Sequence, residues 1–249
     1  MDKQTPVTTL DVNEQLVADF IKMRVQKVLK DIDEMVKNGA KDVSDWQDQF
    51  AHLIRVYGRD SEEPFKWYKY YLREGKLPLE VALPILIQIY MDGSVDKGFV
   101  NILAKVAANE PEEAKADRKA RLSQVLADKI GEDGKVLLFR GEFKKPFGLY
   151  EDEIRSVEKA FCFTTSEKVA GHYAVCWYPE ESAVISACAD LDTILWYTNF
   201  NEEENVIILP VFKGGQLSDV NRRIVTKDDF KPPVDKGTAQ RAYLQNIRK

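Results

Sequence analysis

Three stretches in the second half of the chain combine side chains that can do chemistry, and the first is Leu138-Phe139-Arg140-Gly141. Its arginine and glycine end an apolar run that is typical of a buried strand. A guanidinium placed there needs an anionic partner, and its planar fork can grip a diphosphate while the glycine lets that group approach the backbone. The stretch therefore predicts either an anion-binding arginine or a structural arginine paired with a carboxylate.

The second stretch is residues 162–166, Cys-Phe-Thr-Thr-Ser, followed by the helical pattern of residues 167–174. A strand that ends in hydroxyl residues and leads into a helix can present Thr164 and Thr165 to a ligand. The alternative interpretation is local, because Thr165 or Ser166 is also a suitable N-cap for that helix.

The third stretch is residues 201–205, Asn-Glu-Glu-Glu-Asn, which precede the apolar run 206–209. If the strand already begins there, alternation places Glu202 and Glu204 on one face. Two neighbouring carboxylates do not both ionise freely, so we expect one of the two pKa values to rise, as acid–base work requires. The alternative is a solvated acidic turn.

The order of these stretches resembles the R-S-E class of NAD-dependent mono-ADP-ribosyltransferases. That class has an Arg on one strand, a Ser/Thr-x-Ser/Thr segment leading into a helix, and a Glu-x-Glu just before a strand. The phrases Leu-Phe-Arg-Gly, Phe-Thr-Thr-Ser-Glu-Lys-Val-Ala-Gly-His-Tyr-Ala and Glu-Glu-Glu-Asn-Val-Ile-Ile-Leu-Pro look most like the enzymes with which T-even-type phages modify host proteins. The resemblance covers about residues 135–212.

This resemblance implies a role for each residue of the site. Arg140 would hold the NAD phosphates and the nicotinamide-side ribose, and Thr164, with Thr165, would brace the pocket beneath the nicotinamide. Glu204 would bond the ribose 2′-hydroxyl and stabilise the positive charge that develops as nicotinamide leaves. Glu202 would activate the acceptor, because a guanidinium attacks only beside a base.

The resemblance further implies an arginine of a target protein as acceptor, since Glu rather than Gln stands at position 202. Residues 196–200, Trp-Tyr-Thr-Asn-Phe, would form the loop that recognises the acceptor. NAD is then a co-substrate, and no metal is expected. An inactive binding module of the same fold, an enzyme with a nucleic-acid acceptor, and a helical adaptor protein are the competing functions.

Two departures from the family pattern leave alternatives open. The usual spacing places Cys162 at the first hydroxyl position and Thr164 at the second. Asn205 separates Glu204 from the following strand, where the family has Val directly after the catalytic Glu. Glu203 or Asn205 at the catalytic position therefore stays a possible assignment, and Asn205 there would imply a weak or inactive enzyme.

The elements that must position these residues are read from hydrophobic periodicity, which changes along the chain. The first half has the spacing of six helices, near residues 12–36, 44–58, 61–75, 78–91, 95–108 and 111–131. The second half favours strands near 135–140, 161–164, 183–188, 206–212 and 223–226, with helices at 151–160 and 166–177 and a hairpin turn at 214–215. The sequence predicts an α+β protein with a helical region over 1–131 and a mixed-sheet, NAD-binding ADP-ribosyltransferase-like domain over 132–249.

Composition narrows the possibilities further. The net charge of −5 argues against non-specific nucleic-acid binding. Three cysteines without paired spacing and only two histidines make both a disulfide framework and a zinc site poor explanations. No secretion signal or bilayer-length apolar run is present, so we expect a cytoplasmic protein, in the host cytoplasm if it is phage-encoded.

Overall fold

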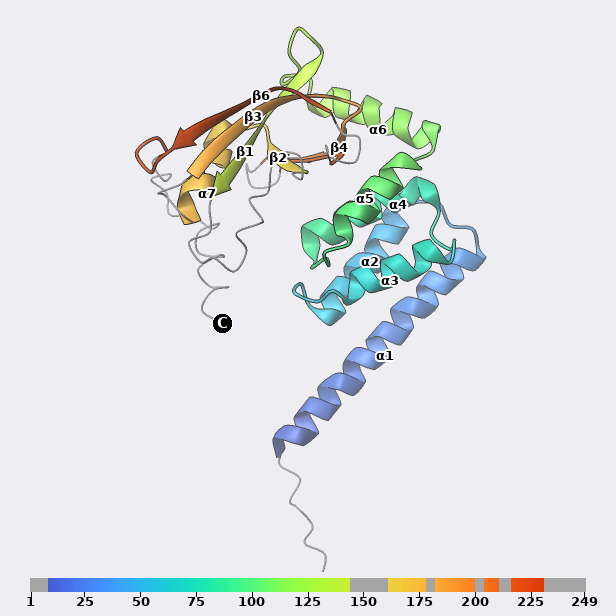
Figure 1. Ribbon diagram of the computed structural model, residues 1–249. Helices are drawn as coiled ribbons and strands as arrows, with labels where there is room; N and C mark the ends of the chain where they lie inside the picture. Colours follow the sequence, from blue (N-terminus) through green and yellow to red (C-terminus); the bar gives the residue numbers. More distant parts are fainter. Residues whose placement is uncertain (1–8, 144–160, 178–181, 200–203, 211–215, 231–249) are drawn as a thin grey trace, which may run out of the picture. The chain divides into compact units, whose positions relative to one another are not determined.

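The computed structural model describes residues 9–143, 161–177, 182–199, 204–210 and 216–230, and it divides into two compact units (Figure 1). The division falls between Lys115 and Ala116, whereas the sequence suggested a boundary at residue 131. The difference has a packing cause. Leu122 and Leu126 are fully buried against the sheet of the second unit, so this stretch belongs to that unit although it continues the helical pattern of the first.

The predicted helices of the first half are all present. Their bounds are α1 Thr9–Lys37, α2 Val43–Tyr57, α3 Glu63–Arg73, α4 Leu79–Asp92, α5 Phe99–Ala108 and α6 Glu112–Val125. The last of these crosses the unit boundary and ends before Gly131, where the sequence placed its stop.

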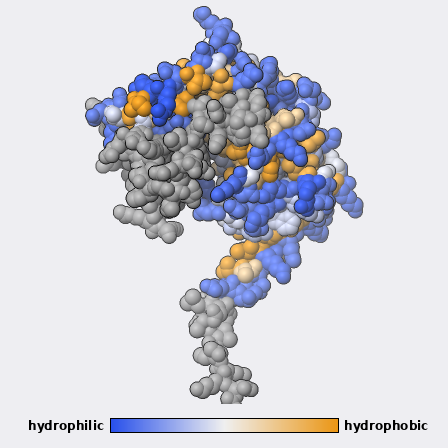
Figure 2. Space-filling model, viewed as in Figure 1, coloured by the Kyte–Doolittle hydropathy of each residue, from blue (hydrophilic) through white to orange (hydrophobic). Residues whose placement is uncertain are grey.

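The helical unit packs around α4, whose residues Val81 to Ile89 are mostly buried. Aromatic residues of α2 and α3 fill the same core, among them Trp46, Phe50 and Tyr68, each without exposed surface. The first half of α1 extends beyond the other helices of this unit (Figure 1), and Figure 2 shows hydrophobic surface there. Among the described helices, none has the length and apolar character to cross a membrane.

The second unit contains an antiparallel sheet. Its strands are β1 Lys135–Phe143, β2 Cys162–Thr164, β3 Ser182–Asp190, β4 Ile194–Thr198, β5 Asn205–Ile208 and β6 Leu217–Val225, in the spatial order β4-β5-β2-β1-β3-β6. Helix α7, Glu167–Trp177, follows β2 as predicted. The α+β class is therefore confirmed, but every pairing among the described strands is antiparallel, where the sequence suggested a mixed sheet.

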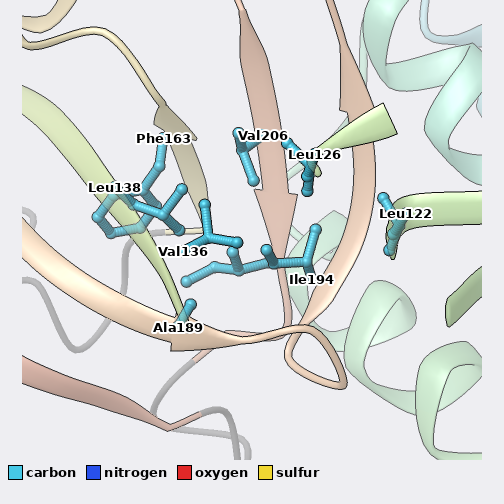
Figure 3. Packing of buried hydrophobic residues seen from close by; sticks show 9 residues of the cluster. Leu122, Leu126, Val136, Leu138, Phe163, Ala189, Ile194 and Val206 are labelled. Carbon is cyan, nitrogen blue, oxygen red and sulfur yellow. The ribbon is translucent and has the colours of Figure 1, made fainter. Parts of the chain in front are cut away.

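The two faces of the sheet pack against different helices. On one face, side chains from five strands converge with Leu122 and Leu126 at the C-terminal end of α6 (Figure 3). We call this the α6 face. On the other, the α7 face, Ala170 and Ala174 of α7 pack with Val184, and Phe139 lies against them. Because side chains alternate along a strand, Arg140 shares the α6 face with Val136 and Leu138.

The predicted helix at 151–160 and the predicted turn at 214–215 lie outside the described residues.

Candidate functional site

The three sequence stretches come together because their strands are neighbours in the sheet. Strand β2 pairs with β1 on one side and with β5 on the other. Phe139 stands opposite Thr164, and Thr164 stands opposite Asn205. Arg140 on β1 and Glu204 directly ahead of β5 are thereby placed two strands apart in one sheet, although 64 positions separate them in sequence.

Arg140 is half-buried on the α6 face, and its guanidinium is only partly satisfied. Nη1 donates to the carbonyl oxygen of Cys162, on the neighbouring strand β2, at 2.7 Å. The buried Nε atom has no hydrogen-bond partner. A buried donor without an acceptor costs free energy, so this guanidinium has hydrogen-bonding capacity that the protein leaves unused. That capacity fits an anion-binding arginine, and the charge of Arg140 also acts on the Glu142 carboxyl, as in a structural arginine.

Glu204 is held by three side chains. One carboxylate oxygen lies 2.8 Å from Lys129 Nζ, and the other accepts a hydrogen bond from Thr165 Oγ1. Tyr197 contributes a further hydrogen bond. The backbone of Glu204 has φ +42°, in the left-handed region that non-glycine residues rarely adopt. The carboxylate is therefore fixed in direction rather than free in an acidic turn.

These contacts decide the ionisation of Glu204. Burial by itself raises the pKa, but the hydrogen bonds from Lys129, Thr165 and Tyr197, together with the Lys129 charge, hold the pKa of Glu204 below its ordinary value. The sequence suggested that one carboxylate of this cluster has a raised pKa. Glu204 is not the carboxylate with the raised pKa, because among the described residues the charge that faces it is the Lys129 cation. Glu202, the other carboxylate of that expectation, lies outside the described residues.

Thr165, and not Thr164, contacts the candidate catalytic carboxylate. Thr164 is 6% exposed and lies opposite Phe139, so its side chain is on the α7 face. Its Oγ1 accepts from the backbone N–H of Ser166, and Ser166 Oγ accepts from Val169 N as the N-cap of α7. Of the two N-cap candidates that the sequence offered, Thr165 and Ser166, the structure therefore has Ser166 as the cap, and Thr165 contacts Glu204.

Gly141 also has a structural role on the α7 face. A Cβ atom at Gly141 would lie 2.2 Å from the carbonyl oxygen of Ala170 and 2.7 Å from the amide nitrogen of Ala174. Both are backbone atoms of α7 and cannot move aside alone. The glycine is thus explained by close helix–strand packing, and the diphosphate contact proposed from the sequence is not needed to account for it.

Gly141→Ala should lower the free energy of unfolding by about 2 kcal/mol or more, as overpacking of a close contact does. Denaturant unfolding measures this, with Leu137→Ala on the same strand as a control, since Leu137 is exposed. If Gly141→Ala has wild-type stability but binds NAD more weakly, the phosphate-contact role of Gly141 is favoured instead.

Glu142 was missed by the sequence analysis and lies two residues beyond Arg140 on the same face. One of its carboxylate oxygens is buried without a hydrogen-bond partner. Burial raises the pKa of Glu142, and the charges of Arg140 and Arg222 reduce that rise without cancelling it. No recognised motif contains Glu142. The one signal in the sequence is its position two residues after Arg140, which puts both side chains on the same face of a strand.

A raised pKa means that the protonated form of Glu142 stabilises the fold. That stabilisation is lost as pH rises from the ordinary pKa of a glutamate through the raised pKa of the folded state. Glu142→Gln should therefore raise the melting temperature at pH 7.5, by on the order of 2 °C. The gain should shrink at pH 4, where the carboxyl is protonated in both states. Scanning calorimetry at the two pH values checks this, with the exposed Glu132→Gln as control. An equal gain at both pH values would contradict it.

A surface pocket of about 470 Å³ opens beside Glu204. Its described lining is Val125, Asp128, Lys129, Tyr197, Thr198, Asn199 and Glu204, and Arg140 is not part of it. The sequence predicted an acceptor-recognition loop over residues 196–200. In the structure Trp196 to Thr198 are instead part of strand β4. Tyr197 instead faces the α6 side and reaches Glu204.

The remaining site predictions are placed as follows. Glu202 and Glu203 lie outside the described residues. Asn205 lies opposite Thr164 on β5, and therefore on the α7 face. Cys162 meets Arg140 through its backbone carbonyl. Within the described ranges, no group of three or more His, Cys, Asp or Glu side chains could hold a metal ion.

Comparison of the chain with protein-family models, with curated proteins and with solved structures finds no match.

Proposed function

We propose that this chain is an NAD-dependent mono-ADP-ribosyltransferase that transfers ADP-ribose to an arginine of a target protein. The observation that carries the proposal is Glu204, a carboxylate on the same face of the sheet as Arg140, whose ionised form is favoured by Lys129 and whose direction is fixed by Lys129, Thr165 and Tyr197. The order of the three stretches, and the adjacency of the strands β5, β2 and β1 that carry them, support it.

The spacing of the two charged groups suits an elongated ligand. Neighbouring strands are about 4.8 Å apart, so β1 and β5 are separated by roughly 10 Å. In the proposed complex Arg140 binds the phosphates and Glu204 lies beside the nicotinamide ribose. The bond from the ribose carbon to nicotinamide breaks, nicotinamide leaves with the electron pair, and a ribosyl cation forms. The negative charge of Glu204 stabilises this cation.

The acceptor guanidinium then attacks that ribose carbon and loses a proton. Glu202 is the proposed base for this step, because a guanidinium is a nucleophile only when a base removes its proton. We place this activity in the cytoplasm, where a phage enzyme of this kind would meet host proteins and NAD. No metal takes part in the proposed chemistry.

The alternative is an inactive binding module of the same fold. The ion pair between Lys129 and Glu204 favours it, since that pair occupies the carboxylate in the free protein. Incubating the purified chain with NAD alone and measuring nicotinamide release separates the two functions. Incubation with labelled NAD and a cytoplasmic lysate then identifies the acceptor, and digestion of the product with protease or nuclease shows whether it is protein or nucleic acid. If neither nicotinamide release nor labelling of any species is found, the inactive binding module is the better explanation.

A further inference from the structure

Lys129 occupies a fixed position next to Glu204. It follows α6 in a turn in which its backbone N–H donates to the carbonyl of Leu126 at 2.8 Å. Leu126 is fully buried, and Ile130 forms a bridge to Val136 of β1. The Lys129 backbone is therefore held between two anchored neighbours, and its side chain can reach Glu204 without ordering a loop.

The ion pair is partly shielded from solvent. The side chain of Lys129 is 24% exposed and that of Glu204 is 17% exposed, with 2.8 Å between Nζ and Oε1. Asp128 lies 3.8 Å from the same ammonium but is 77% exposed, so it is a weaker partner. Tyr197 adds a neutral hydroxyl. In the described part of the chain, Lys129 is thus the cation that faces the candidate catalytic carboxylate.

We propose that Lys129 is a built-in counter-cation of Glu204 that occupies, in the free protein, the place of the ribosyl group of NAD, so that Lys129 and NAD compete for one carboxylate. This inference rests on the proposed function. Lys129, Thr165 and Tyr197 already take three of the roughly four acceptor positions of the Glu204 carboxylate, and Lys129 holds Oε1. A ribose hydroxyl that approaches Oε1 therefore competes with Lys129. Lys129 lines the pocket and can move its ammonium into solvent, whereas Thr165 is a short side chain that directly follows strand β2.

The pairing has a second effect on the carboxylate. A cation at this distance favours the ionised form, as the lowered pKa of Glu204 and the raised pKa of Lys129 indicate. Lys129 is therefore a positioning residue. It keeps Glu204 charged in the free protein, and it weakens NAD binding by the free energy needed to separate the pair.

The test compares Lys129→Met, which removes the charge, with Lys129→Arg, which retains it. Lys119→Met is the matched control, because Lys119 pairs with Asp192 on the surface away from Glu204. The first measurement is the titration of the Glu204 carboxyl carbon by NMR in the ligand-free protein, assigned with Glu204→Gln. We expect its pKa to rise in Lys129→Met and to stay at the wild-type value in the other two variants. No rise in Lys129→Met would overturn the charging role.

The second measurement is NAD affinity, made at a pH above the Glu204 titration that the first measurement finds in each variant. Partly exposed ion pairs are weak, so we expect Lys129→Met to bind NAD about 2- to 5-fold more tightly. In a Glu204→Gln background the same change should have no effect, which is the double-mutant test of competition. Unchanged or weaker binding in Lys129→Met would overturn the competition.

These two measurements distinguish the inference from the proposed function. If the wild-type protein does not bind NAD, the proposed function and the competition both fail, while the carboxyl titration still decides whether Lys129 keeps Glu204 charged. If the protein binds NAD and Lys129→Met changes neither measurement, the proposed function stands and the inference about Lys129 fails.

Discussion

Glu204→Gln is expected to lower NAD cleavage by about 100-fold or more while the fold stays intact, because one fixed charge that stabilises a transition state has an effect of that size. Glutamine keeps the shape of the side chain and can still accept from Thr165. It cannot provide the negative charge that the developing ribosyl cation needs. The loss should therefore appear in the rate of cleavage more than in the structure.

Nicotinamide release and a thermal melt on the same preparation check this result. Glu132→Gln is the control, because it removes a carboxylate from the surface of the same unit. The Glu204 variant also loses its ion pair with Lys129, so a small loss of stability at neutral pH is expected. That loss should disappear in acid, since a group with a lowered pKa stabilises the fold only while it is ionised. Normal cleavage by Glu204→Gln would move the catalytic role to another residue, with Glu203 the first to examine.

Arg140→Lys is expected to weaken NAD binding by about tenfold or more, because lysine keeps the charge but loses the planar fork that grips a phosphate in two places. The substitution also removes the Nε donor, which is buried without a partner in the free protein. Arg140 has three nitrogen atoms, so it can donate to the carbonyl of Cys162 with one of them and to a ligand with another. Lysine has a single nitrogen and cannot divide these contacts between separate atoms.

Calorimetric titration with NAD measures the effect. Arg223→Lys is a suitable control, because Arg223 is on the α7 face and pairs with Glu167. Since Arg140 also links β1 to β2, a melting curve must accompany the titration. We expect Arg140→Lys to bind NAD more weakly with an unchanged melting temperature. Equal NAD affinity of Arg140→Lys and Arg223→Lys would reject the phosphate-binding role of Arg140.

Several features of this protein could be predicted from the sequence because they depend on local pattern. The apolar spacing of α2 and α4 was enough to predict both helices. The switch to strand-like runs after Gly134 located β1 in the same way. The stretches with Arg140, Thr165 and Glu204 were recognisable because each has its residue types within a few positions.

Only the tertiary structure decided which of these side chains meet. Thr164 and Thr165 are adjacent in sequence, so alternation alone predicts that they point to opposite faces. Which of them lies on the α6 face beside Glu204 follows from the pairing of Phe139 with Thr164, a contact between distant strands. Lys129 and Tyr197 reach Glu204 from elements that have no motif, and Gly141 is explained by a helix that begins 26 positions later. Strand pairing and helix packing join residues remote in the chain, and local periodicity contains no information about which remote partner will be chosen.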